Sequence, residues 1–258
     1  MKAIILAAGK GERMRPLTET VPKPMLRVRG KALICHMIDA LPMEVTEVIV
    51  VTDYLAEKIE KGLGSTYAGR EITYIRQGPE RGTAGALWQC RDRMRTGERF
   101  LLGYADDLHD PNAIKELLRY DRGLLVHEVA DPSRFGIVYA SHAGTVKAIV
   151  EKPKVASSNL AAVGVYLLDT NIFTYWPKPD AKGEHVLTDS IAASLNWYEM
   201  TAVKSHFWVP VGYPKDLVRA SVALAKREHT PFVGTLLGWR ERVLAWFRGL
   251  IPTEPVAS

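Results

Sequence analysis

The chain has 258 residues, of which 47% are hydrophobic and 24% are charged, with a formal net charge of +5. These values are ordinary for a soluble globular protein with enough material for a large core. The positive charge is not gathered into a basic block or interleaved with aromatic residues. The composition therefore argues against nucleic-acid binding, and it suits polyphosphate substrates.

Cysteine content and hydropathy exclude further classes of protein. The two cysteines, Cys35 and Cys90, stand in apolar surroundings outside any metal-spaced cluster, which predicts reduced core thiols in a cytosolic protein. The sequence begins as a strand from its second residue rather than as a signal peptide, and no apolar run is long enough to span a bilayer. We therefore expect a cytoplasmic protein.

The first predicted element is a strand buried on both faces, because the apolar run that starts at Ile4 does not alternate with polar residues. The run ends in small residues and two glycines, Gly9 and Gly11, which allow a tight turn and present N–H groups to an anion. Arg13 follows directly, and Lys23 comes one loop later. A buried strand, a small-residue loop and neighbouring cations are the elements that triphosphate binding requires.

Two familiar phosphate-binding motifs do not match this loop. Gly9-Lys10-Gly11 lacks the Gly-Lys-Ser/Thr ending of a Walker loop. Arg13-Met14 stand where a dinucleotide-binding fingerprint requires a third glycine. Taken alone, Gly-x-Gly is equally compatible with a structural turn.

Strands and helices alternate through the first half of the chain. Helices are expected over residues 32–41, 54–63, 83–94 and 113–120, and strands over residues 47–52, 72–75, 100–104 and 124–129. Buried strands that alternate with helices predict an α/β protein with a doubly wound, mostly parallel sheet. Ligands bind such sheets beyond the carboxyl ends of the strands, where the first loop, Asp53 and Asp106 are expected.

The pattern changes after residue 130. A hairpin of strands 135–140 and 146–150 around Gly144 is followed by strands 161–168 and 202–211 and by helices 188–197 and 215–226. We infer a smaller, mixed second lobe that grows from the same sheet and carries the site of a second substrate. The expected division is 1–130 and 131–230 within one domain, followed by a C-terminal segment, 231–258.

The C-terminal segment contains one amphipathic stretch, residues 235–251. One helical stripe carries Leu236, Trp239, Val243, Trp246 and Leu250. Packing of this helix on its own domain, or on a sister subunit of a homo-oligomer, is the favoured interpretation. Membrane contact by the helix is the alternative, because two tryptophans near arginines are typical of a membrane interface.

Residues 77–86 form a glycine-rich segment between a strand and a helix. The glycines allow close backbone approach, and the helix N-terminus favours an anion or the polar edge of a ring. The Gln77 side chain both donates and accepts, so it can match the N3–H and carbonyl edge of uracil or thymine. The same residues are compatible with a surface turn and a helix cap.

Two further groups of polar residues stand at strand ends. Asp106 and Asp107 end a buried strand, and carboxylates there are hard oxygen ligands that suit Mg²⁺, although a turn or helix cap is the plain alternative. Glu151 can accept hydrogen bonds from two vicinal sugar hydroxyls, and Lys152 offers a point charge to a phosphate. Alone, these two residues are equally compatible with a solvated strand end.

Together these strings resemble the sugar-1-phosphate nucleotidyltransferases (nucleotide-sugar pyrophosphorylases) over about residues 2–225. The most specific string is Leu-Ala-Ala-Gly-x-Gly-x-Arg-Met-x-Pro-x-Thr followed by Pro-Lys-Pro, and the chain is most similar to glucose-1-phosphate thymidylyltransferase and uridylyltransferase members. The resemblance implies a Rossmann-like nucleotidyltransferase fold, a nucleoside triphosphate and a sugar 1-phosphate as substrates, and Mg²⁺ as cofactor. It assigns the nucleotide to residues 1–130 and the sugar phosphate to residues 131–230.

The resemblance also implies roles for individual residues. The catalytic positions are Arg13 and Lys23, which neutralise charge on the reacting phosphates. The nucleotide-binding positions are Leu6, Ala8, Gly9, Gly11, Gln77, Gly82 and Thr83. The sugar-phosphate-binding positions are Phe135, Gly136, Glu151, Lys152 and Ala162, and the metal-binding positions are Asp106 and Asp107.

Three details bear on specificity. A glutamine five residues before Gly82 is similar to members that use UTP or dTTP. The Gly82–Ala86 string also resembles guanylyltransferases, but those usually carry acidic residues just before it, so a pyrimidine nucleotide is favoured. Ala162 stands where acetylglucosamine-specific relatives tend to carry asparagine, which favours an unmodified hexose such as glucose.

One motif departs from the family pattern. Relatives read Trp-x-Asp-x-Gly, with the aspartate as a second metal ligand, whereas this chain has Pro210 between Trp208 and Gly212. Proline has no side-chain oxygen and cannot coordinate a hard cation. This departure leaves a non-catalytic nucleotide-sugar-binding subunit as one alternative. Within the enzyme class, the alternative is a guanylyl- or cytidylyltransferase of the same family.

Overall fold

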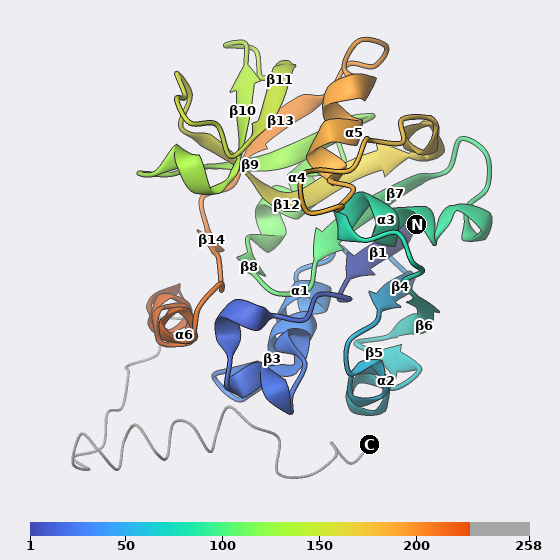
Figure 1. Cartoon of the computed structure of the whole chain (residues 1–258), viewed down its shortest axis with the longest axis vertical. Helices are drawn as coiled ribbons and strands as arrows, with labels where there is room; N and C mark the ends of the chain where they lie inside the picture. The colour runs from blue at the N-terminus through green and yellow to red at the C-terminus, as the bar shows by residue number, and fades with distance from the viewer. Residues whose placement is uncertain (228–258) are drawn as a thin grey trace.

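The strands expected from the sequence lie mainly in one ten-stranded mixed sheet, which runs through the middle of Figure 1. The computed structural model describes residues 1–227, so the expected C-terminal amphipathic helix lies outside the described residues. The strand order is β11-β10-β12-β7-β1-β4-β6-β5, with β9 paired to β12 and β13 paired to β9. These strands are β1 (Lys2–Leu6), β4 (Glu47–Thr52), β5 (Thr66–Tyr67), β6 (Arg70–Arg76), β7 (Arg99–Tyr104), β9 (Gly123–Glu128), β10 (Gly136–Ala140), β11 (Val146–Glu151), β12 (Leu160–Asp169) and β13 (Thr201–Lys204).

Two small sheets and the α-helices complete the described chain. The small sheets pair β2 (Arg27–Val28) with β3 (Lys31–Ala32) and β8 (Leu108–His109) with β14 (Trp208–Val209). The helices are α1 (Leu33–Asp39), α2 (Ala56–Leu63), α3 (Gly82–Trp88), α4 (Pro111–Leu117), α5 (Leu187–Ser194) and α6 (Pro214–Arg227). Most lie close to the predicted bounds, but α3 ends at Trp88 rather than at residue 94, and a 3₁₀ turn, Arg91–Arg93, follows it.

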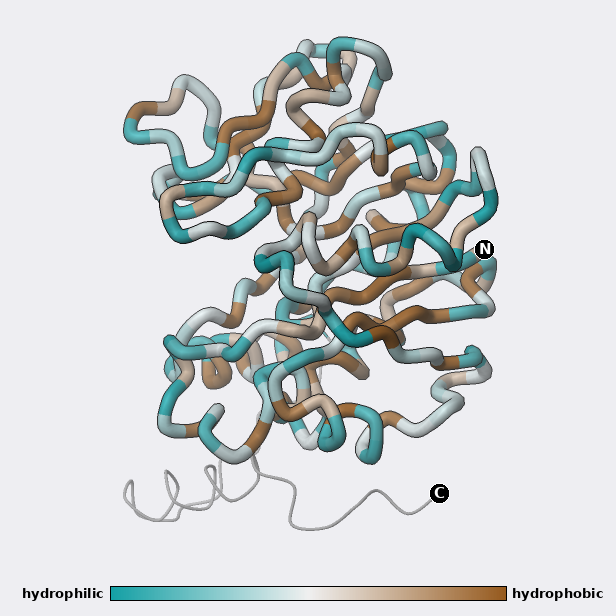
Figure 2. The backbone as a smooth tube through the Cα atoms, turned by 45° about the vertical axis from the view of Figure 1, so that its right-hand side comes forward, coloured by the Kyte–Doolittle hydropathy of each residue, from teal (hydrophilic) through white to brown (hydrophobic). Residues whose placement is uncertain are grey.

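β1 is the centre of the parallel part of the sheet. It lies between β4 and β7 and is parallel to both, and Ala3, Ile4 and Ile5 are fully buried. Successive residues enter two different cores: Ile5 packs with residues of α1 and α4, and Ile4 packs with residues of α3 and α5. Helices therefore cover both faces, which confirms the predicted doubly wound sheet. Figure 2 shows the hydrophobic residues along these inner strands and the hydrophilic ones along the outer loops.

The second half of the chain extends the same sheet, as expected. β12 is antiparallel to β7, and β10 and β11 form the predicted hairpin. The chain then returns to the first half, because β14 leads into α6, and α6 contacts β2. Within residues 1–227, no helix has the length and apolar character that crossing a bilayer requires.

The strand expected at 124–129 is β9, which runs in the same direction as β7, although the antiparallel β12 lies between them. One other strand prediction is wrong. The single strand expected over 202–211 is two strands, β13 and β14. β13 runs parallel to β9, after which the chain leaves the large sheet and β14 pairs with β8. The apolar pattern continues through this change of partner, so the sequence alone does not reveal it.

Candidate active site

The loop after β1 folds back on itself around Lys23. Gly11 has φ +63°, and a Cβ there would lie 3.0 Å from the Lys23 Cβ and 3.1 Å from the Thr18 Cγ2. The Thr18 hydroxyl donates to the Gly11 carbonyl oxygen at 2.8 Å. Only glycine adopts this backbone conformation so close to other side chains without strain. The turn predicted at Gly11 therefore serves to place Lys23 beside the loop.

In the first residues of this loop, the backbone rather than a side chain is available for contact with a ligand. Leu6 ends β1 half-buried, Ala8 is buried, and Gly9 is exposed. No atom lies within 4 Å of the position that a Cβ would take at Gly9. The predicted nucleotide-binding residues of this loop thus leave room for a ligand beside the backbone.

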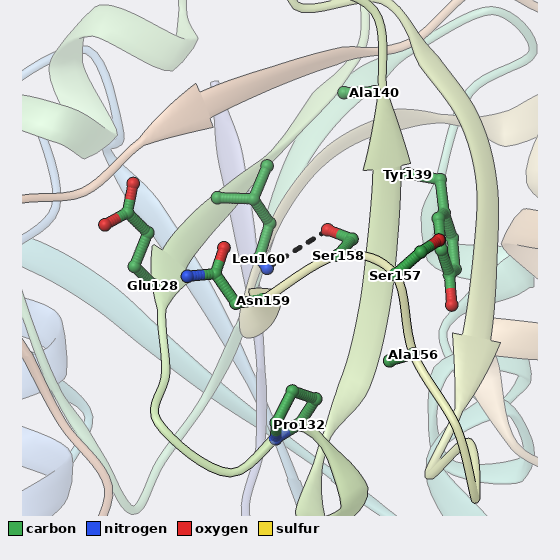
Figure 3. Close-up of a pocket in the computed structure, with 9 residues that line it drawn as sticks. All are labelled: Glu128, Pro132, Tyr139, Ala140, Ala156, Ser157, Ser158, Asn159 and Leu160. Atoms are coloured by element: carbon green, nitrogen blue, oxygen red, sulfur yellow. Dashed lines mark hydrogen bonds between the residues drawn. The ribbon is translucent and has the colours of Figure 1, made fainter.

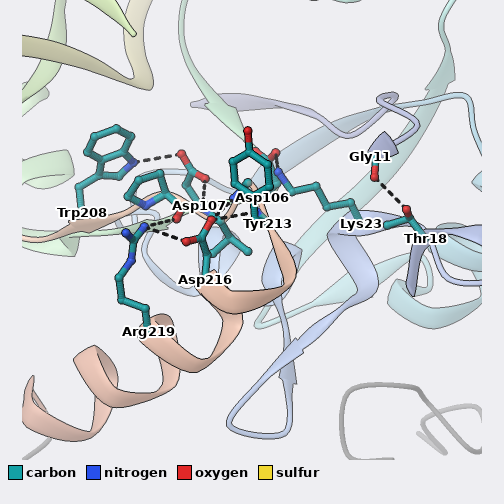
Figure 4. A network of polar contacts seen from close by, with 12 residues as sticks. Gly11, Thr18, Lys23, Asp106, Asp107, Trp208, Tyr213, Asp216 and Arg219 are labelled. Carbon is teal, nitrogen blue, oxygen red and sulfur yellow. Dashed lines mark hydrogen bonds and ion pairs between the residues drawn. The ribbon is translucent and has the colours of Figure 1, made fainter. Parts of the chain in front are cut away.

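Lys23 and Asp106 form an ion pair, drawn in Figure 4. Asp106 lies two residues beyond β7 and the Lys23 loop follows β1, and these adjacent strands are parallel, so both groups reach the same edge of the sheet. The side chain of Lys23 is largely buried, and that of Asp106 is partly exposed. The structure therefore brings together a cation and a carboxylate that are 83 positions apart in the chain.

Asp107 binds different partners from those of the adjacent Asp106. Its Oδ2 accepts a hydrogen bond from the Trp208 indole at 3.0 Å, and its Oδ1 accepts one from the Val211 N–H at 2.9 Å. Removal from water, and then the charge of Asp106, raises the pKa of Asp107 to about 7. Asp107 thus fastens the segment after β14 to the end of β7.

Gln77 spans its own loop. Its amide nitrogen donates to the Glu80 carbonyl at 2.8 Å and to the Gly82 carbonyl at 3.2 Å. Both N–H groups of the side chain are therefore occupied inside the loop, and the side-chain oxygen is the atom left for a base edge. Sequence reasoning identified the residue but not this internal role.

The nucleotide loop is joined to residues 183–187 of the second half. Gly82 has φ +93°, and a Cβ there would lie 2.4 Å from the His185 carbonyl oxygen. The His185 N–H donates to the Arg81 carbonyl at 2.8 Å, and the Ala84 N–H donates to the His185 carbonyl at 2.9 Å. The Thr83 hydroxyl accepts from the Leu187 N–H at 2.9 Å. This contact supports the loop, and sequence reasoning assigned no role to residues 183–187.

Four of the five predicted sugar-phosphate residues come together at one end of the β10–β11 hairpin, and the fifth, Ala162, lies on β12. Gly136 pairs with Glu151 in register, and the Lys152 N–H donates to the Phe135 carbonyl at 3.0 Å. The Glu151 carboxylate lies 2.7 Å from the Lys152 ammonium. It also accepts a hydrogen bond from the Thr188 hydroxyl at 3.1 Å. Thr188 is a contributor that sequence reasoning missed.

Tyr104, the last residue of β7, was also missed. Its ring centre lies 6.2 Å from that of Tyr166 on β12, the strand that also carries the predicted Ala162. Burial raises the pKa of Tyr104 to about 12, with the charges of Glu151 and Asp106 adding to the shift. The half-buried Tyr104 ring therefore stands at the end of β7, beside β12. Its position directly before Ala105-Asp106 was the available sequence signal.

A surface pocket of about 570 Å³ is lined by none of these residues. Figure 3 draws the residues that line it. It is lined by the end of β9, the end of β10 and the loop before β12, with Glu128, Tyr139, Ser158 and Asn159 among its residues. Among residues 1–227, no lysine or arginine lines it, and Glu128 already pairs with Lys204. The pocket therefore lacks the cations that a phosphate requires, and the residues around Lys23 and Asp106 are the stronger candidate site.

Comparison with known proteins agrees with this geometry. Residues 2–227 match the protein-family model described as nucleotidyl transferase. The chain belongs to this family. A solved structure, UDP-glucose pyrophosphorylase complexed with UDP-glucose, is similar to this nucleotidyl transferase with a TM-score of 0.78 and 26% identity, covering 88% of this chain and 98% of that one. The Rossmann-like nucleotidyltransferase fold predicted from the sequence is thereby confirmed.

Curated relatives give the same result. The nucleotidyl transferase is 32% identical over 239 residues to the bifunctional protein GlmU of Methanocaldococcus jannaschii, covering 92% of this chain and 57% of the relative. It is 33% identical over 228 residues to the UTP–glucose-1-phosphate uridylyltransferase AglF of Haloferax volcanii, covering 84% of this chain and 93% of the relative. The chain thus spans little more than half the length of the GlmU relative.

Proposed function

We propose that the protein joins a nucleoside triphosphate to a sugar 1-phosphate, forming an NDP-sugar and releasing pyrophosphate. The observation that carries the proposal is the start of α5, which joins the two groups of predicted residues. The Leu187 N–H donates to Thr83 of the nucleotide loop, and the Thr188 hydroxyl donates to Glu151 of the sugar-phosphate group. Two sites joined by adjacent residues suit a reaction between two bound substrates, because catalysis then depends mainly on positioning.

The proposed chemistry needs charge neutralisation more than covalent participation. An oxygen of the sugar phosphate attacks the α-phosphorus, and the bond to the departing pyrophosphate breaks. Arg13 and Lys23 neutralise charge on the triphosphate, and Lys152 holds the attacking phosphate. Glu151, oriented by Thr188 and Lys152, accepts hydrogen bonds from the sugar hydroxyls. No general base is required, because the attacking phosphate is already ionised near neutral pH.

We propose Asp106, and not Asp107, as the protein ligand of Mg²⁺. The Asp106 side chain is partly exposed beside Lys23, whereas both Asp107 oxygens already accept hydrogen bonds. Among residues 1–227, no three ligating side chains of aspartate, glutamate, histidine or cysteine come together. One carboxylate with substrate oxygens and water suffices for Mg²⁺, so the residues present fit the ion. When bound, it would supply further positive charge to the phosphates.

For the finer specificity we propose dTTP or UTP with glucose 1-phosphate. Gln77 offers its side-chain oxygen to the N3–H of a pyrimidine, and Ala162 leaves no amide for an N-acetyl group. The similarity to the AglF uridylyltransferase supports a pyrimidine nucleotide. A guanylyl- or cytidylyltransferase of the same family is the alternative.

Pyrophosphate release is the direct test. The protein is incubated with Mg²⁺, each of five nucleoside triphosphates (ATP, GTP, CTP, UTP and dTTP) and each of several sugar 1-phosphates. We expect the highest kcat/KM for UTP or dTTP with glucose 1-phosphate. A clear preference for GTP with mannose 1-phosphate would support the alternative, and no turnover with any pair would refute the enzymatic proposal.

A non-catalytic subunit is the second candidate, because Pro210 replaces the expected second carboxylate. Such a subunit would still bind nucleotide through the loop after β1. Thermal stabilisation by UTP or dTTP without any pyrophosphate release would identify it.

A further inference from the structure

Arg13 has an aromatic partner rather than an acidic one. Its guanidinium carbon lies 5.3 Å from the centre of the Tyr213 ring. A Cβ at Gly212 would lie 3.8 Å from that same carbon, so the backbone beside Tyr213 also borders Arg13. Within residues 1–227, Arg13 forms no ion pair with a carboxylate. Its guanidinium N–H groups are therefore not occupied by a carboxylate of the described residues.

The segment that carries Tyr213 is fastened at both ends, as Figure 4 shows. At one end Asp107 accepts hydrogen bonds from Trp208 and Val211. At the other end the Asp216 Oδ2 accepts from the N–H groups of Gly212 and Tyr213, both at 2.9 Å. Asp216 is buried, at 6% exposure, so this anchor is protected from water. The backbone of Tyr213 is therefore fixed relative to the end of β7.

We propose that Tyr213 is a positioning residue for Arg13, and that Asp107 anchors the segment that presents it. A guanidinium against a ring face keeps its N–H groups free for phosphate oxygens, because the ring occupies none of them. A carboxylate partner would occupy those donors and cancel the charge. Tyr213 thus orients the cation without neutralising it. This inference rests on the proposed function, in which Arg13 acts on the triphosphate.

The inference gives Asp107 a task distinct from that of Asp106. Adjacent carboxylates at one strand end serve two elements: Asp106 pairs with Lys23, and Asp107 holds the segment that leads to Tyr213. Lys23 and Arg13 are therefore both positioned relative to the end of β7, Lys23 by Asp106 and Arg13 by the segment that Asp107 holds. Pro210, which lies inside the fastened segment, adds no carboxylate that would compete for Arg13.

A double-mutant cycle tests the inference. Tyr213→Leu and Tyr213→Phe are made in the native chain and in the Arg13→Ala variant. Tyr213→Leu should lower kcat/KM for the nucleotide about three- to tenfold, the range of a partly exposed cation–ring contact, and Tyr213→Phe should stay within about twofold. In the Arg13→Ala background, Tyr213→Leu should cause no further loss, because its effect runs through Arg13.

Controls separate positioning from folding and from the proposed function. Tyr120→Leu removes a comparably exposed ring outside the site and should change neither kcat/KM nor the melting temperature. An equal loss from Tyr213→Leu in both backgrounds, or an equal loss from Tyr213→Phe, would overturn the inference while the enzymatic function stands. If the native protein has no turnover, the same cycle is measured as UTP and dTTP affinity by calorimetry; additive losses there, or no binding, would overturn the inference.

Discussion

Replacing Gly82 by alanine probes the contact that joins the nucleotide loop to the second half of the protein. Two costs add at this position. The backbone has φ +93°, and positive φ costs an L-residue about 1–2 kcal/mol. The new methyl carbon would also lie 2.4 Å from the His185 carbonyl oxygen, against an ordinary contact of 3.4 Å or more.

The second cost follows from this distance. The His185 backbone must move by about 1 Å, and overpacking of this kind costs about 1–3 kcal/mol. That movement also strains the hydrogen bonds that His185 makes to Arg81 and Ala84. We expect Gly82→Ala to lower the free energy of unfolding by about 2–5 kcal/mol. We also expect a higher KM for the nucleotide, because Thr83 belongs to the same contact.

Gly97→Ala is the matched control. Gly97 has φ +75°, but no atom lies within 4 Å of the position that its Cβ would take. This variant should therefore show the conformational cost of about 1–2 kcal/mol alone. Urea unfolding followed by circular dichroism gives both free energies, and initial rates give both values of KM. Equal destabilisation of the two variants would show that Gly82 and His185 are not in close contact and would refute the reasoning.

Further predictions concern single residues. Gln77→Glu should lower kcat/KM for UTP and dTTP more than for other nucleotides, because the carboxylate repels the carbonyl oxygens on either side of the pyrimidine N3–H. The lost N–H bonds to the loop carbonyls would cost all nucleotides alike, so an equal loss would limit Gln77 to loop support. Thr188→Val removes the donor to Glu151 and should raise KM for the sugar 1-phosphate about three- to tenfold without changing KM for the nucleotide, and parallel changes in both would contradict it. Asp106→Asn should lower kcat about 10²–10³-fold and raise the Mg²⁺ concentration needed for half-maximal rate; full activity would show that the ion lies elsewhere. Burial raises the pKa of Cys90 to about 12, so almost no thiolate exists at pH 8, and a thiol reagent should label it only after unfolding; rapid labelling of the native protein would place Cys90 outside the core.

The sequence by itself determined the doubly wound sheet and most of its elements. A strand buried on both faces, such as β1, must be apolar at every position, so its place in a parallel sheet is visible without any partner. The loop after β1 and the carboxylates after β7 were also predictable, because both directly follow an apolar strand in the sequence. Lys23 and Asp106 follow strands that are adjacent and parallel, so predicting the sheet was enough to predict that they lie near each other.

Only the tertiary structure determined which distant residue each of the two adjacent aspartates contacts. Asp106 and Asp107 are the same residue type at successive positions, yet one pairs with Lys23 and the other holds Trp208, more than 100 positions further along the chain. The direction of each side chain depends on the backbone beyond the strand end, where no periodic pattern reports it.

The same reason explains the residues that the sequence did not reveal. Thr188 acts through Glu151, 37 positions away, and residues 183–187 act through the loop that carries Thr83, 104 positions from Leu187. The break between β13 and β14 depends on a change of partner strand within one continuous apolar pattern. Periodicity records whether a residue is buried, but hydrogen bonds between distant loops depend on which surfaces the fold brings together, and those contacts exist only in the folded chain.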